Sequence, residues 1–229
     1  MKVKHDAPNT LLTYRERLSL AARLVVIALI CLVANACSCP RLSAPSPRDV
    51  LVDEYARTVK IAVKCKEGNE VGGTGVRVGG TAVLTAFHVV SCAIDSITVT
   101  DQDTNEYPAT LEAASDADIA RLDVPSMTPM PSVRIGAVEV GDRACAAVFL
   151  PQRGRRCGET WPGDGTNGAG SVHIDFVAEH GNSGSGVWNE RGELVGILVH
   201  LRYCLGTENP QVCGAGVTPL ALRSWLAAR

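Results

Sequence analysis

The sequence of 229 residues has no excess of charge of either sign and no long run of lysine or arginine. Its 22 basic and 24 acidic residues give a formal net charge of −2, which argues against nucleic acid as the main partner. Disorder is also excluded, because 46% of the residues are hydrophobic. The 22 glycines and 12 prolines follow no three-residue period, so they predict many turns rather than a collagen-like chain.

A hydrophobic run long enough to cross a bilayer as a regular helix is missing as well. Residues 1–23 carry five basic and two acidic side chains, and an apolar stretch of 13 residues, Leu24–Ala36, follows them. A helix needs about 20 residues to span a membrane. The basic start, short apolar core and small residues at its end are typical of a secretory signal, which we place at residues 1–36. An uncleaved, shortened anchor and a buried core helix are the alternatives.

Cleavage after Ala36 would make Cys37 the first residue of the mature chain. This arrangement resembles a bacterial lipoprotein, in which such a cysteine receives lipid and attaches the protein to a membrane. Ala34 and Asn35 depart from the usual lipoprotein residues, and a soluble secreted product of the same cut is the alternative. Both readings place the protein outside the cytoplasm, attached to a membrane only through its N-terminal segment or a lipid.

The rest of the chain divides into a short linker and one domain. Residues 37–50 are rich in proline and serine, a composition that suits a tether. We expect residues 51–229 to form a single domain, which is consistent with the length. The chain shows no internal repeat.

Nine cysteines are too many for a routine cytosolic protein and favour disulfide bonds. Apart from Cys37 and Cys39, the exported part holds six, whose connectivity the sequence alone does not fix. We favour bonds between sequence neighbours: Cys65–Cys92, Cys145–Cys157 and Cys204–Cys213. A zinc site is the competing interpretation, but the domain has no Cys-x2-Cys pair, and we predict no metal or other cofactor.

From residue 57 onward, short apolar or alternating runs are separated by glycine, proline, asparagine and aspartate. The clearest runs are 58–64, 75–78, 81–84, 96–100 and 194–199. Their β-branched residues and regular spacing predict an all-β barrel or sandwich. Two segments have a helical pattern, residues 48–57 and residues 219–228 after Pro219.

One segment has the features of a nucleophile. Ser183 lies between glycines in Glu179–Gly186. A serine hydroxyl needs a base to take its proton and N–H donors for the oxyanion that forms on attack of a carbonyl. Neighbouring glycines allow a tight turn and a close approach of substrate to the backbone. An ordinary Gly-Ser turn between strands is the alternative interpretation.

Two further segments supply a base and an acid. His88 lies at the end of an apolar strand, where an imidazole is able to act as a base. Asp118 precedes another apolar strand, where its carboxylate would orient the imidazole. Each residue alone has an ordinary structural explanation, and Asp116 and Asp123 compete with Asp118.

The order His88, Asp118, Ser183, with the residues 30 and 65 positions apart, is one of the orders in which the catalytic triad occurs. Residues 57–218 resemble the chymotrypsin-like serine proteases, in particular the bacterial glutamyl-endopeptidase and HtrA-type protease domains. The shared segments are Thr85–Val90, Asp118–Leu122, Gly181–Ser185, Val187–Asn189 and Gly192–Ile197. The resemblance implies an all-β double six-stranded barrel with a short C-terminal helix.

The resemblance also implies a function, a serine endopeptidase that hydrolyses peptide bonds in protein or peptide substrates. Ser183 would attack the scissile carbonyl, His88 would transfer the proton, and Asp118 would orient His88. The backbone N–H groups of Gly181 and Ser183 would form the oxyanion hole.

The chain departs from the digestive members of that family in two places. Asn182 stands where they have an aspartate, so no ion pair with a newly cut N-terminus is expected. By the family's register, the specificity pocket would consist of Val177, Ala178, Val199, His200 and Leu201. Val177 brings no acid, and Leu198 stands where glutamyl-specific relatives have histidine. We therefore expect a small or apolar side chain before the cleaved bond.

Two other function classes stay open at this point. One is a catalytically inactive double barrel that binds a protein partner. The other is a lipid-anchored structural protein, an interpretation that rests on Cys37 alone.

Overall fold

The computed structural model describes residues 46–115, 118–149, 152–162, 172–203 and 212–216, and of residues 47, 49, 177, 200–203 and 212–216 it describes the backbone alone. The chain divides into two compact units, Met1–Ala44 and Pro45–Arg229, and all described residues belong to the second. The predicted signal segment, Cys37, Cys204 and the predicted C-terminal helix lie outside the described residues. No helix in the described ranges is long and apolar enough to span a membrane.

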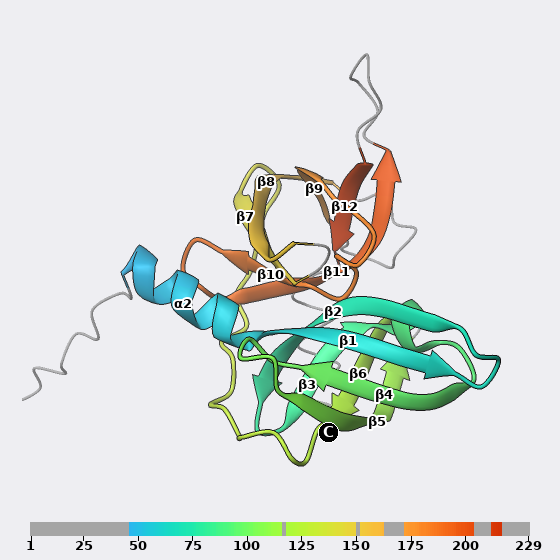
Figure 1. Ribbon diagram of the computed structural model, residues 1–229. Helices are drawn as coiled ribbons and strands as arrows, with labels where there is room; N and C mark the ends of the chain where they lie inside the picture. Colours follow the sequence, from blue (N-terminus) through green and yellow to red (C-terminus); the bar gives the residue numbers. More distant parts are fainter. Residues whose placement is uncertain (1–45, 116–117, 150–151, 163–171, 204–211, 217–229) are drawn as a thin grey trace, which may run out of the picture. The chain divides into compact units, whose positions relative to one another are not determined.

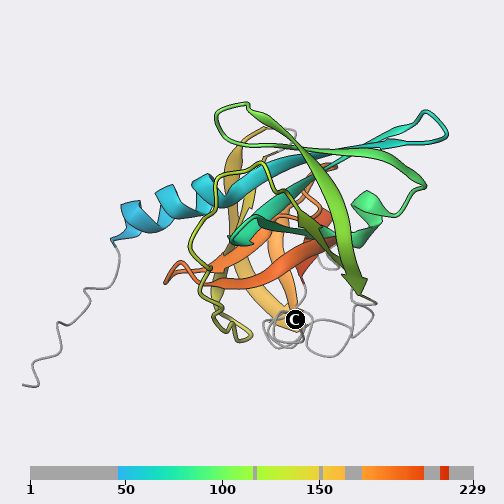
Figure 2. The same ribbon diagram turned by 90° about the horizontal axis from the view of Figure 1, so that it is seen from below.

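The first described element is the helix α2 (Pro47–Arg57). Proline is favoured at the first helical position, because its fixed φ suits a helix and its missing N–H would have no partner there. The helix predicted over residues 48–57 is therefore confirmed, and it includes the last four residues of the predicted tether. Figures 1 and 2 both show α2 leading directly into the first strand.

The body consists of β-strands with one short 3-10 helix, η1 (Phe87–Val90). The strands are β1 (Thr58–Cys65), β2 (Glu70–Gly79), β3 (Ala82–Ala86), β4 (Ile94–Thr100), β5 (Glu106–Ser115), β6 (Ile119–Asp123), β7 (Arg143–Val148), β8 (Gly154–Pro162), β9 (Val172–Val177), β10 (Gly186–Asn189), β11 (Leu194–Tyr203) and β12 (Val212–Gly216). They close into two rings, β1-β2-β3-β6-β5-β4 and β10-β11-β12-β9-β8-β7 (Figure 1). The predicted all-β double six-stranded barrel is confirmed.

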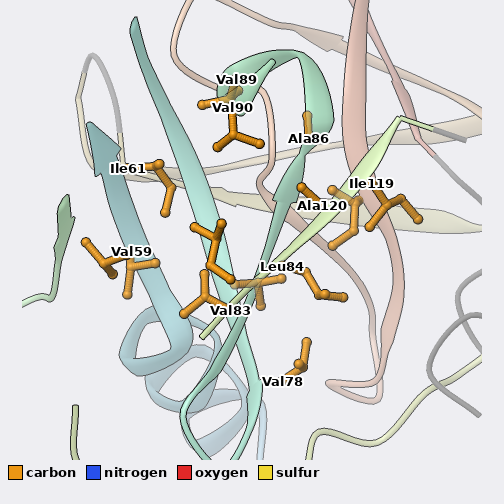
Figure 3. Close-up of a cluster of buried hydrophobic side chains, with 14 of the residues drawn as sticks. Val59, Ile61, Val78, Val83, Leu84, Ala86, Val89, Val90, Ile119 and Ala120 are labelled. Atoms are coloured by element: carbon orange, nitrogen blue, oxygen red, sulfur yellow. The ribbon is translucent and has the colours of Figure 1, made fainter. Parts of the chain in front are cut away.

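Alternation of apolar and polar residues explains how the strands of the first barrel form. In β1, Val59, Ile61 and Val63 are buried, whereas Lys64 on the opposite face is exposed. Figure 3 shows Val59 and Ile61 in a buried cluster with side chains from β2, β3, η1 and β6. The same cluster contains Trp188, Leu194 and Ile197 from β10 and β11 of the second barrel. The core of the first barrel therefore extends onto β10 and β11 of the second barrel, which also has a separate core of its own.

Two of the three predicted disulfides are present. Cys65–Cys92 joins the end of β1 to the segment just after η1, and Cys145–Cys157 joins directly paired residues of β7 and β8. The third predicted pair falls partly outside the described residues. In the chain-entropy model, closing loops of this length stabilises the fold by about 3–3.5 kcal/mol each.

Helix α2 is attached to both barrels by charged side chains. Glu54 is 1% exposed and accepts hydrogen bonds from Nε and Nη2 of Arg155 on β8, at 2.8 and 2.9 Å. Arg57 donates to the carbonyl oxygens of Arg77 and Pro131 beside the first barrel. Burial raises the pKa of Glu54 above its ordinary value of 4.5, although Arg155 acts in the opposite direction. Removing Arg155 alone would leave a buried carboxylate without its partner.

The loop between β9 and β10 contacts the first barrel at Gly184, whose φ is +88°. A Cβ atom there would lie 2.0 Å from the carbonyl oxygen of Thr74 and 2.2 Å from Oγ1 of Thr85. These distances are far below van der Waals contact, so only glycine fits between the loop and strands β2 and β3. Gly68 in the β1–β2 turn has nearly the same φ, +86°, but a Cβ there would meet nothing within 4 Å.

These two glycines form a matched pair for a stability measurement. We expect Gly68→Ala to lower the free energy of unfolding by about 1–2 kcal/mol, the cost of a side chain in the left-handed region. Gly184→Ala adds a steric clash and should lower it by about 3 kcal/mol or more. Urea unfolding measures both. Equal losses in the two variants would contradict the close contact at Gly184.

Candidate active site

Strand pairing brings His88 and Asp118 together although 30 residues separate them in the sequence. Ala86, the last residue of β3, is the pairing partner of Ile119, the first residue of β6. His88 follows β3 in η1, and Asp118 immediately precedes β6. The register of these two strands therefore places both side chains at the same end of the first barrel.

Asp118 holds the backbone and the imidazole ring of His88. Its Oδ2 lies 2.7 Å from Nδ1 of His88, and its Oδ1 accepts a 2.8 Å hydrogen bond from the His88 N–H. The Asp118 carbonyl oxygen also accepts the N–H of Phe87 at 3.0 Å. Asp118 has a φ of +58°, a left-handed conformation that aspartate tolerates better than most residues. A carboxylate placed in this way fixes the tautomer and orientation of the imidazole.

The structure also distinguishes Asp118 from one of its competitors. Asp123 lies at the far end of β6, where its Oδ1 accepts a 2.8 Å hydrogen bond from the Thr81 hydroxyl. Its role is therefore local to the β3–β6 pair. Asp116, the other competitor, lies outside the described residues.

Ser183 lies in the segment Glu179–Ser185, which we call the nucleophile loop. The loop begins with a turn in which the Asn182 N–H donates to the Glu179 carbonyl oxygen at 3.0 Å. Gly181 occupies the third position of this turn with a φ of +92°, the conformation that a type II turn requires there. Glycine adopts this conformation without strain.

Asn182 organises the loop from inside. It is 1% exposed, and its side-chain Oδ1 accepts the Glu179 N–H at 2.9 Å. Its carbonyl oxygen accepts both the N–H of Ser185, at 3.1 Å, and the Ser185 hydroxyl, at 2.7 Å. The side-chain amide of Asn182 thus bonds within the loop itself. This agrees with the expectation that the loop forms no ion pair with a newly cut N-terminus.

The two N–H groups expected to form an oxyanion hole belong to this loop. In the described part of the chain, no hydrogen bond uses the N–H of Gly181 or of Ser183. Two unshared donors, two residues apart in a tight turn, are suited to bind an oxygen that becomes negatively charged.

The nucleophile loop of the second barrel is attached to β2 of the first barrel. The Thr74 N–H donates to the Ser183 carbonyl oxygen at 2.8 Å, and the Thr74 hydroxyl donates to the Gly181 carbonyl oxygen at 2.7 Å. A Cβ atom on the neighbouring Gly73 would lie 2.8 Å from Val89, the residue after His88, and 3.1 Å from the Ser183 oxygen. Only a glycine backbone therefore separates the nucleophile loop from the 3-10 helix that carries His88.

The sequence analysis did not identify Thr74. A signal for it was present, because a threonine in the glycine-rich stretch Gly72–Gly75 is the one polar side chain there. Its importance depends on a contact with a loop 107 residues away, which no local pattern reveals.

The residues predicted to form the specificity pocket are only partly described. Val177 on β9 and Leu201 on β11 pair with Cys213 and Gly214 of β12, so β12 connects the two strands. His200 also lies on β11, and it pairs with Ala215 of β12. Ala178 and Val199 are both buried, but Ala178 packs in the core of the second barrel and Val199 in the cluster of the first. The pocket stays a prediction.

Metal chemistry has no ligand set in the ranges that the structure describes. No three or more histidine, cysteine, aspartate or glutamate side chains lie close enough there to hold an ion.

Comparisons with known proteins agree with this architecture. Among solved structures, the chain is similar to the HtrA-type protease AlgW with a tripeptide, at a TM-score of 0.64 and 19% identity. A substituted form of AlgW, also with a tripeptide, gives a TM-score of 0.64 and 18% identity. Both matches cover 80% of this chain but only 63% of the AlgW chain. Identities this low support the fold alone. A search of curated proteins returned no match.

The family comparison concerns the sequence itself. The model of the trypsin-like peptidase domain matches residues 73–197, more than half of the chain. This range includes η1 with His88, the start of β6 with Asp118, and the whole nucleophile loop. The expected resemblance to chymotrypsin-like serine proteases is confirmed, and the chain belongs to the trypsin-like peptidase domain family.

Proposed function

We propose that the chain is a serine endopeptidase in which His88, Asp118 and Ser183 form the catalytic triad. The observation that carries this proposal is the two-point bond between Asp118 and His88, which holds an imidazole beside the strand that binds the Ser183 loop. The substrates would be proteins or peptides, as is usual for this family of domains.

The proposed reaction assigns one role to each of these residues. The Ser183 Oγ attacks the scissile carbonyl carbon while His88 takes the hydroxyl proton, and the carbonyl oxygen becomes an oxyanion bound by the N–H groups of Gly181 and Ser183. His88 then gives the proton to the leaving amine, and the C–N bond breaks to leave an acyl-enzyme. Water, deprotonated by His88, releases the acid and restores Ser183. Asp118 stabilises the imidazolium in both steps and stays ionised.

A fluorophosphonate probe tests this proposal, because it phosphonylates serine hydroxyls that a base activates. We expect the wild type to be labelled and Ser183→Ala to be unlabelled. Asp118→Asn should lower the labelling rate on the order of 10⁴-fold, because it favours the wrong imidazole tautomer. Asp123→Asn is the matched control, since the Asp123 carboxylate binds the Thr81 hydroxyl at the far end of β6 from Asp118, and it should react at close to the wild-type rate.

Two outcomes would contradict the proposal. Equal labelling of wild type and Ser183→Ala would place the reactive group elsewhere. Absence of labelling in the folded wild type would favour the alternative function, a catalytically inactive barrel that binds a protein partner.

The substrate preference is a separate proposal. Aliphatic residues at the pocket positions Val177, Ala178, Val199 and Leu201 favour a small or apolar side chain before the cleaved bond, and Val177 supplies no acid to attract lysine or arginine. Cleavage of a peptide library, read by mass spectrometry, should show most cuts after alanine, valine or leucine. Dominant cleavage after glutamate or arginine would refute this preference.

We further propose that the domain acts outside the cytoplasm. Disulfides Cys65–Cys92 and Cys145–Cys157 support this location, because such bonds persist in oxidising compartments. If Cys37 is lipidated, the intact mass of the mature protein from bacterial membranes will exceed that of residues 37–229 by the mass of the lipid. A mature chain of unmodified mass in the soluble fraction would exclude the anchor, and a retained residue 1 would exclude cleavage.

A further inference from the structure

Thr74 joins two parts of the molecule that the proposed reaction needs. It lies in β2, is fully buried, and donates through its backbone N–H and its hydroxyl to two residues of the nucleophile loop, Ser183 and Gly181. Its carbonyl oxygen accepts the Thr85 hydroxyl at 2.8 Å, three residues before His88. One residue thus connects the strand that leads to the base with the loop that carries the nucleophile.

The hydroxyl bond acts on the carbonyl group of Gly181, not on its N–H. The peptide plane between Gly181 and Asn182 is held at both ends, because the carbonyl oxygen is bound by Thr74 and the Asn182 N–H is bound by Glu179. The preceding peptide plane, which contains the Gly181 N–H, has no such bond in the described part of the chain.

A glycine without a side chain gives that preceding plane little resistance to rotation. Rotating it exchanges a type II turn for a type I turn, in which the third residue has a φ near −90°, and it points the N–H to the opposite side. The φ of +92° at Gly181 belongs to the type II form. When that plane rotates, the backbone must also rotate about the Cα atom of Gly181. Because Thr74 holds the Gly181 carbonyl group, this second rotation is limited, and the observed type II turn is favoured.

We infer that Thr74 is a positioning residue for the oxyanion hole, and that its hydroxyl keeps the Gly181 N–H aimed at the substrate oxygen. This inference rests on the proposed serine endopeptidase function. It gives Thr74, a buried residue of the first barrel, a role in how the second barrel binds the transition state.

The second contact of the hydroxyl indicates why a threonine suits this position. Its Oγ1 also accepts the Phe149 N–H, at 3.4 Å, beside the end of β7. Replacing the hydroxyl by a methyl group would leave both the Gly181 oxygen and the Phe149 N–H without this partner. The backbone bond from Thr74 to Ser183 would be unaffected, so the loop would stay attached while the turn loses its restraint.

Thr74→Val and Thr74→Ser separate the hydroxyl from the size of the side chain. The measurement is the rate of fluorophosphonate labelling of the full chain as a function of pH. We expect Thr74→Val to lower the plateau rate by about 10- to 100-fold, the range seen when reacting groups are slightly misplaced. The midpoint of the pH profile should not move, because the His88–Asp118 bonds are untouched. Thr74→Ser should restore the rate to near the wild-type value.

Thr58→Val is the matched control. Thr58 is also fully buried and donates its hydroxyl to one backbone carbonyl, that of Glu54, at 2.7 Å. It lies in β1 and does not contact the nucleophile loop. Both valine variants should lose similar thermal stability, but only Thr74→Val should lose labelling rate.

Each outcome decides the inference. If Thr74→Val is labelled as fast as the wild type, or if Thr58→Val slows equally, the positioning role is refuted. A shifted pH midpoint in Thr74→Val would assign its effect to the base instead and would also refute it. If Thr74→Val does not fold, Thr74→Ala, which also lacks the hydroxyl, replaces it with the same expected loss. Failure of the wild type to be labelled at all would instead refute the proposed function, so the two failures are distinguishable.

Discussion

The hydrogen bond between the Thr74 N–H and the Ser183 carbonyl oxygen is the constraint on which the candidate site depends. His88 and Asp118, the proposed base and its carboxylate, belong to the first barrel, and the proposed nucleophile and oxyanion donors belong to the second. Each barrel alone would hold half of the site. The Thr74 bond, together with the glycines at 73 and 184 that allow close approach, makes the two halves into one arrangement. The apolar core shared through Trp188, Leu194 and Ile197 keeps that arrangement in place.

Hydrogen bonds hold some groups of the candidate site and leave others unused. This difference suits the proposed chemistry. Asp118 binds His88 at two points, so the imidazole of this proposed base is already oriented in the structure. The carbonyl groups of Gly181, Asn182 and Ser183 all accept hydrogen bonds, whereas the N–H groups of Gly181 and Ser183 are unused in the described part of the chain. Donors that are held in place but not satisfied are able to stabilise a developing charge without reorganising, which is the basis of electrostatic catalysis.

Much of this structure could be predicted from local sequence. Alternation in residues 58–64 and 194–199 gave β1 and part of β11, and neighbouring cysteines gave two disulfides. β8, with the polar sequence Gly154–Thr160, has no such alternation and was not predicted. The left-handed conformation of Asp118, the inward bonds of Asn182 and the role of Thr74 depend on contacts between distant segments, so no local pattern could reveal them.

The central claim is that the nucleophile loop presents two N–H groups to an oxygen bound at Ser183. A crystal structure of the domain after reaction with diisopropyl fluorophosphate tests it most directly. We predict phosphorus on the Ser183 Oγ and the phosphoryl oxygen about 2.7–3.1 Å from the backbone nitrogens of both Gly181 and Ser183. A phosphoryl oxygen directed away from these nitrogens, or an adduct on another residue, would contradict it.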